Sequence, residues 1–216
     1  MRSFRFTVIA LAALGLSGCM MSDPPSRSGL GAPSLAAQQP SGYNVKRVTV
    51  QVPRSLTVSE ENTYKPAADI VWHGEAAGNR FAQVEKLTRD GITAGTGAFR
   101  TGRAVTLDVQ VARFHALTQK TRDSFGGKHE LIYALTLRDA ATGEVLREIP
   151  RVNATVRAAG GAAAQAEEAV GRTQAVVIRE ALAASIQKEL GRGAGGDRLQ
   201  AAVARAAQSP SGAPLK

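Results

Sequence analysis

Cysteine is almost absent from this chain, which holds a single one, Cys19, among 216 residues. One cysteine excludes an internal disulfide. The apolar segment from Phe6 to Gly18 is also short, at about thirteen residues where a membrane-spanning helix needs roughly 20. The motifs G-x-S-x-G, H-E-x-x-H and G-x-x-x-x-G-K, which mark a hydrolase elbow, a zinc protease and a phosphate-binding loop, do not occur. The sequence therefore points to no enzyme class.

The N-terminus has the layout of a secretory signal peptide, because two arginines precede a short apolar segment that ends in small residues. At its end, Leu16-Ser17-Gly18-Cys19 resembles the lipobox of bacterial lipoproteins, which is a leucine and two small residues before a cysteine. The resemblance implies that residues 1–18 are removed and that the Cys19 thiol receives a diacylglyceryl group, with the new amino group acylated as well. The alternative is an ordinary signal peptide with a chance cysteine near its cleavage site.

Lipidation would consume the lone thiol, and two or more acyl chains hold a protein on a membrane without a transmembrane helix. In the sorting rule of bacterial lipoproteins an aspartate after the lipidated cysteine favours the inner membrane. This chain has Met20 there, which favours the outer membrane, with the protein facing the periplasm. Residues 19–42 are rich in Pro, Ser, Gly, Ala and Gln and are predicted to form a flexible tether.

The chain is basic, with a formal net charge of +9. Loss of Arg2 and Arg5 with the signal lowers this charge by two, to +7. Nucleic acid is excluded as the partner because an exported protein does not meet a genome. Two interpretations remain, an attraction to an anionic membrane surface or a simple use of arginine as a solvated residue.

Residues 43–190 are predicted to form one α+β domain. Val48, Val50 and Val52 alternate with polar residues, as in a half-buried strand that ends at Pro53. A second short strand is expected at 68–75. A helix should follow, capped by Asn79, and its glycines at 91, 95 and 97 predict that it frays or ends there.

Three further strands are predicted as an antiparallel meander. Two have alternating apolar residues, over 105–111 and 131–137, and the turn at 139–145 leads into the third. Pro150 indicates a bulge or a sheet edge in that third strand.

A long amphipathic helix is expected over residues 162–190, stopped by Gly191. The predicted fold is a two-layer α+β sandwich, in which one shorter helix and this long helix pack on a mostly antiparallel sheet of about four to five strands. Residues 191–216 should form a Gly-rich break, a stretch that could form a short helix and a disordered tail.

Few residues are candidates for a site. Trp72 is either a core residue that anchors the helix to the sheet or an exposed contact for a partner. Arg113, Phe114 and His115 form a cluster that is either a contact surface or merely the end of a strand. The three histidines of the chain fall on separate strands or strand ends without metal-ligand spacing, so we expect neither a metal nor another cofactor.

Three segments of the domain, "DIVWHGEAAGNRFAQV", "VARFHALTQKTR" and "LRDAATGEVL", are similar to a family of uncharacterised alphaproteobacterial lipoproteins. The similarity spans residues 45–190. More distantly, the order of elements resembles that of the ABC-type transport auxiliary lipoproteins (PqiC-like). The second resemblance implies a place beside machinery that moves phospholipids between the two membranes, and it is an analogy of layout.

These observations favour a non-enzymatic envelope lipoprotein that is anchored through Cys19 and binds a protein partner as an auxiliary subunit. The alternative is a lipid-binding module with an apolar groove between the sheet and the long helix. The sequence leaves the partner and the oligomeric state open.

Overall fold

The computed structural model of the chain describes the backbone of residues 42–208 and the side chains of residues 42–192. The predicted signal peptide, lipobox, Cys19 and tether lie outside the described residues, as does the end of the C-terminal tail. The described elements are β1 (Tyr43–Gln51), β2 (Ile70–Val71), α1 (Arg80–Thr96), β3 (Arg103–His115), α2 (Gln119–Arg122), β4 (Gly127–Asp139), β5 (Val145–Asn153), β6 (Val156–Ala158), α3 (Gly161–Ala169) and α4 (Gln174–Gln208).

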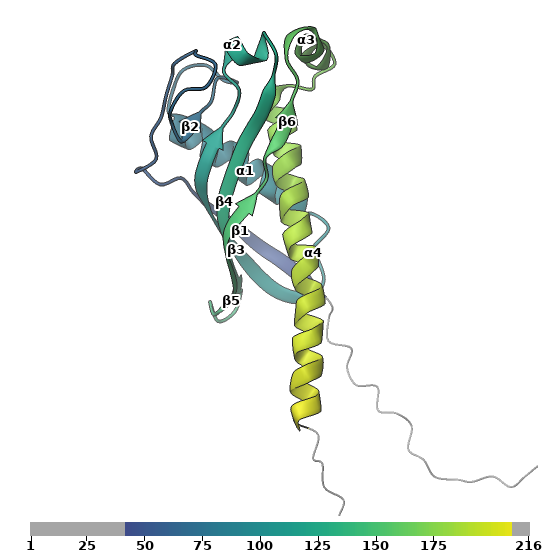
Figure 1. Ribbon diagram of the computed structural model, residues 1–216. Coiled ribbons are helices and arrows are strands. Elements are labelled where there is room, and N and C mark those ends of the chain that lie inside the picture. The colour runs from purple at the N-terminus through teal and green to yellow at the C-terminus, as the bar shows by residue number, and fades with distance from the viewer. Residues whose placement is uncertain (1–41, 209–216) are drawn as a thin grey trace, which may run out of the picture. The chain divides into compact units, whose positions relative to one another are not determined.

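The fold is a mixed α+β arrangement with a six-stranded sheet, which confirms the predicted class. The main strand order is β1-β3-β4-β5 (Figure 1). Strands β3, β4 and β5 form the predicted antiparallel meander. Strand β1 joins β3 in parallel, because α1 carries the chain between them. The short strands β2 and β6 pair with β3 and β4 respectively.

The core lies between one face of the sheet and the helices α1 and α4. Alternate residues of β3 and β4 are buried, as a strand with one covered face requires. Helix α4 contributes Ile178, Leu182, Ile186 and Leu190, all at 2% exposure or less. Their spacing of four residues places them on one side of the helix, which confirms the predicted amphipathic face.

Pro150 marks both of the features expected of it. Its strand, β5, lies at the edge of the main sheet order, and the pairing register with β4 shifts between Tyr133 and Leu135, opposite Val152 and Ile149. An edge strand tolerates proline because the missing N–H would face solvent.

The predicted end of α1 at its glycines is wrong. Asn79 caps the start of the helix as expected, since its side chain accepts a hydrogen bond from Ala82 N at 3.2 Å. The helix then continues through Gly91 and Gly95 to Thr96. These two glycines stand one turn apart where α1 crosses α4, and they allow close approach of the two backbones.

The predicted helix over residues 162–190 is in fact two helices. Gly171 adopts a φ of +80°, which interrupts the helical conformation between α3 and α4. Its N–H and that of Arg172 satisfy the last carbonyls of α3, at Glu168 and Glu167. The predicted stop at Gly191 is also wrong, because the backbone of α4 is helical through Gln208. No helix within the described residues is both long and apolar enough to cross a membrane.

Candidate binding groove

An open groove of about 300 Å³ lies at one end of the sheet. It forms where the end of β3, the short helix α2, the start of β4 and the loop at residues 62–66 meet. Its lining is mostly apolar and comes from Tyr64, Lys65, His115, Ala116, Leu117, Thr121, Phe125, Gly126, Gly127, Lys128 and Glu130. We call these residues the aromatic groove.

Two aromatic side chains form the outer wall of the aromatic groove. The rings of Tyr64 and Phe125 stack with their centroids 5.2 Å apart. Both are unusually exposed for large apolar residues, at 51% and 72%. The ammonium group of Lys120 lies 4.6 Å from the centroid of the Tyr64 ring, a cation–π contact. An exposed aromatic pair beside a cation is typical of a contact surface rather than of a core.

The loop that carries Tyr64 is fixed in place by polar contacts with the segment that follows β3. The Thr118 hydroxyl donates to Thr63 O at 2.7 Å, and the Thr121 hydroxyl donates to Tyr64 O at 2.6 Å. Next to them, Lys120 N donates to the Asn62 side chain at 2.8 Å. The groove is therefore formed before any ligand binds, which lowers the entropy lost on binding.

The electrostatics of the groove are basic. Glu130 is its one lining carboxylate, and it accepts hydrogen bonds from Lys65 at 2.7 Å and Arg113 at 2.8 Å. These bonds lower the pKa of Glu130 to about 2, so the carboxylate is ionised and neutralised by its partners. Lys120 and Lys128 are exposed and have no ion pair among the described residues. The mouth of the groove thus has an excess of positive charge.

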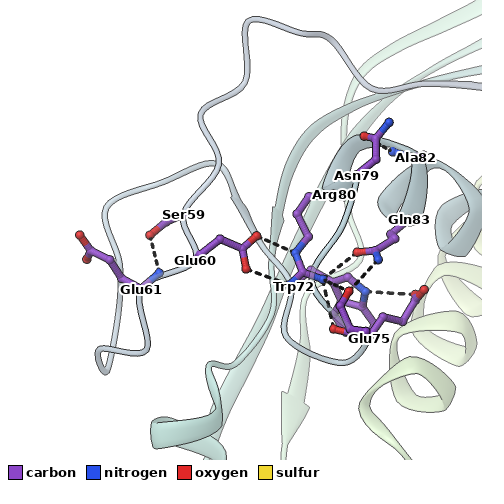
Figure 2. Close-up of polar contacts among 10 residues, drawn as sticks. Ser59, Glu60, Glu61, Trp72, Glu75, Asn79, Arg80, Ala82 and Gln83 are labelled. Carbon is purple, nitrogen blue, oxygen red and sulfur yellow. Dashed lines mark hydrogen bonds and ion pairs between the residues drawn. The ribbon is translucent and has the colours of Figure 1, made fainter.

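A second polar cluster, at the N-terminus of α1, is structural. Arg80 is buried, at 6% exposure, and donates two hydrogen bonds to the Glu60 carboxylate, at 2.7 and 2.8 Å. Figure 2 shows these contacts. Arg80 also donates to the carbonyls of Glu75 and Ala76 and to the side chain of Gln83. The Glu60 contact links the loop before β2 to the start of α1, and the contacts with the carbonyls of Glu75 and Ala76 tie down the loop between β2 and α1.

Comparison with known proteins identifies the family of this chain. Residues 43–206 match the model of a family described as a family of unknown function (DUF6778). The chain belongs to this family. The match begins at the first residue of β1 and covers every described helix and strand up to the last turn of α4. This confirms the expected membership of an uncharacterised family. No curated protein matches the chain.

Three solved structures are similar to this DUF6778 member over part of the chain. A DUF330 protein from Xanthomonas campestris has 13% identity and a TM-score of 0.43, over 76% of this chain and 92% of that one. The PelC dodecamer from Paraburkholderia phytofirmans has 12% identity and a TM-score of 0.34, over 68% and 86%. A protein from Caulobacter crescentus CB15 described as a "putative lipoprotein" has 23% identity and a TM-score of 0.31, over 56% and 89%.

The residues singled out from the sequence are not brought together on a surface. Trp72 has 0% exposure and Phe114 1%, so neither offers a contact surface on the folded domain, whereas His115, at 5%, is among the residues that line the aromatic groove. The core interpretation of Trp72 is the one that the structure confirms. Phe114 and His115 are buried because β2 pairs with the end of β3 and covers it. Arg113 remains partly exposed, but it is engaged by Glu130.

Within the described residues, no group of three or more histidines, cysteines or carboxylates is arranged to hold a metal ion. His115 Nε2 lies 3.0 Å from Pro66 O, which ties the loop at 62–66 to β3. His129 Nδ1 accepts a hydrogen bond from Leu117 N at 3.2 Å, beneath the groove. Both rings are therefore structural supports of the groove.

Tyr64 and Phe125 were not among the residues predicted from the sequence to form a site. Both lie in short polar stretches, "ENTYKP" and "RDSFGG", between predicted elements. Neither residue belongs to a strand or helix pattern that would place its ring in the core, so a surface role is the simpler interpretation. The sequence thus contained a signal, a large aromatic residue in each of two polar loops. Only the structure shows that the two rings stack on each other.

His129 makes stability depend on pH. Burial lowers its pKa from 6.5 to about 4, whereas the unfolded chain keeps the higher value. Between these values the unfolded state binds more protons, so stability is full above pH 6.5 and falls as the pH drops toward 4. We expect a loss on the order of 2–3 kcal/mol in urea unfolding across this window.

The variant His129→Gln should flatten that dependence. The pKa of His73 is also lowered by burial, less strongly, so His73→Gln should remove only a smaller part of the slope. An unchanged slope in His129→Gln would show that the ring is not the titrating group.

Proposed function

We propose that this protein is a non-enzymatic, lipid-anchored binding protein of the cell envelope, facing the periplasm. The observation that carries the binding role is the preformed aromatic groove, with the exposed Tyr64–Phe125 pair at its wall. Two titratable groups of the groove are already engaged: Glu130 lies in two ion pairs, and His115 contacts Pro66 O. They hold the architecture, which fits recognition better than proton transfer.

Anchoring is supported by the sequence from Leu16 to Cys19, which ends a short apolar segment. About 23 residues separate Cys19 from Tyr43, and a chain of this length spans at most about 80 Å. The folded domain would therefore stay within reach of the membrane that holds the anchor. Met20 after the cysteine favours the outer membrane.

A role as auxiliary subunit of an envelope complex, including one that moves lipids, is the wider context that we propose. The second candidate function is lipid binding, at a different place from the groove that was expected between the sheet and the long helix. The contact between the sheet and α4 is filled by buried Val177, Ile178 and Leu182, and the pocket beside Val177 has only about 10 Å³. A groove of about 300 Å³ lies at the end of the sheet beside α2.

Cys19→Ala should release the protein from the membrane fraction. The domain over residues 43–206 does not involve this residue, so its far-UV circular dichroism should be unchanged. The measurement is fractionation of cells after an alkaline carbonate wash, which removes peripheral proteins. Met21→Ala is the matched control and should stay in the membrane fraction. Retention of the Cys19→Ala chain after the wash would overturn the proposed anchor.

A further inference from the structure

We infer that the aromatic groove binds an anionic amphiphile, with one acyl chain in the groove and its charged head group beside Lys128 and Lys120. This inference rests on the proposed binding function and names the chemical class of its ligand. The occupant is a single lipid molecule, as distinct from a bilayer surface or a peptide.

The apolar lining of the groove favours binding of an acyl chain. Tyr64, Phe125 and Leu117 offer carbon surface to a ligand. The Thr121 hydroxyl donates to Tyr64 O, so it does not need a ligand partner. A ligand that enters therefore meets hydrocarbon, which favours burial of an aliphatic chain in proportion to the area it covers.

The backbone of the groove argues against a peptide as occupant. Ala116 N donates to Val71 O, Leu117 N to His129 Nδ1 and Gly126 N to Thr121 O. Peptides that bind by strand addition need a row of unpaired N–H and C=O groups. These three donors are all used, whereas an acyl chain needs no donors.

The cations at the mouth of the groove favour an anionic head group on the ligand. Glu130 is neutralised by Lys65 and Arg113, which leaves the ammonium groups of Lys120 and Lys128 in excess. A phosphate or carboxylate beside them would gain charge-assisted contacts. A volume of about 300 Å³ stands at the lower end of the usual range for ligand sites, which fits one chain better than two.

A substitution that fills the groove tests whether the acyl chain of the ligand binds there. Gly127 lines it, and a Cβ added there would lie 3.3 Å from Leu117 Cδ2, so Gly127→Leu projects a side chain into the groove. The probe is 1-lauroyl-lysophosphatidylglycerol below its micelle-forming concentration, titrated calorimetrically into the full Cys19→Ala chain. We expect saturable one-to-one binding that Gly127→Leu weakens at least tenfold, with unchanged circular dichroism.

Phe125→Ser provides a second variant that does not depend on the packing of Gly127. It removes an exposed wall of the groove and should weaken binding about fivefold. Val170 is another highly exposed apolar residue, at 81%, and lies outside the groove, so Val170→Ser is the matched control and should bind as the parent does. An equal loss in Val170→Ser would overturn the inference.

The head group is tested by charge reversal. The double variant Lys120→Glu/Lys128→Glu should weaken binding of the phosphatidylglycerol probe about tenfold. It should leave binding of the zwitterionic lauroyl-lysophosphatidylcholine nearly unchanged. Lys188→Glu reverses an exposed lysine on α4 and should change neither. Equal affinity of the parent chain for both probes would contradict an anionic head group.

Two further arms separate the other occupants. Flotation with vesicles of phosphatidylcholine and phosphatidylglycerol that depends on Phe125, without binding of the monomeric probe, would assign the surface to a bilayer and overturn the inference. Capture of an envelope protein by a photo-cross-linker at position 125, again without probe binding, would overturn it in favour of a protein partner. Both results would leave the proposed binding function standing, and the fractionation of Cys19→Ala tests the anchor independently.

Discussion

Replacing Gly95 with leucine is expected to force α1 and α4 apart and to lower the free energy of unfolding by about 3 kcal/mol. A Cβ at this position would lie 2.4 Å from Ile186 Cγ2, 2.5 Å from Ala183 O and 2.7 Å from Ala183 Cα. Two of these three atoms belong to the backbone of α4, so a rotamer change cannot relieve the overlap. Urea unfolding followed by circular dichroism measures the effect.

Gly191→Leu is the matched control for that experiment. Gly191 also lies within a helix, but nothing stands within 4 Å of an added Cβ. Leucine has the higher helix propensity, so the variant should be as stable as the parent or more stable by up to about 1 kcal/mol. A Gly95→Leu protein that unfolds at the parent's urea concentration would show that the two helices do not pack as closely as described.

Trp72→Ala is expected to cost about 3–5 kcal/mol of folding free energy, a large share of the stability of a domain of this size. The indole is fully buried and packs edge-on against Phe114, with ring centroids 5.9 Å apart. Its Nε1 donates to Glu75 at 3.1 Å, a contact drawn in Figure 2. The substitution therefore leaves both a cavity and an unpaired acceptor.

Phe125→Ala provides the comparison, because this ring is 72% exposed and should change stability by less than about 0.5 kcal/mol. Thermal unfolding of the two variants beside the parent chain separates the core residue from the surface residue. Unchanged stability of the Trp72→Ala protein would contradict the core role of Trp72.

The strands and the start of α1 could be predicted from the sequence because their signals are local. Alternating apolar residues in β3 and β4 require one covered face, and the Asn79 side chain satisfies a backbone donor two positions into the helix. Neither signal depends on which distant helix packs against the sheet. Such features survive in the folded protein because tertiary packing reinforces them.

The glycines show where sequence reasoning fails. Gly91, Gly95 and Gly191 resemble helix terminators in the sequence, yet all three are helical. At Gly91 and Gly95 the missing side chain serves a contact with a helix about 90 residues away, which no local pattern reveals. Gly171 is the reverse case, since it lies within an amphipathic pattern and nevertheless breaks the helix through its positive φ.

The candidate site could not be predicted because it combines two segments that are distant in the sequence, residues 64–65 and residues 115–130. Tyr64 and Phe125 are about 60 residues apart, and the groove exists only because Thr118 and Thr121 hold the first loop against α2. The residues that did stand out, Trp72, Phe114 and His115, are distinctive because the core needs large side chains at the end of β3. A rare residue type marks packing as readily as function.

The most direct test of the account is intact-mass spectrometry of the mature protein extracted from its native membrane. The account predicts a chain that begins at Cys19 and carries the added mass of a diacylglyceryl group on sulfur, with a further acyl chain on the new amino group. A chain with an unmodified thiol, or one that begins at another residue, would contradict it.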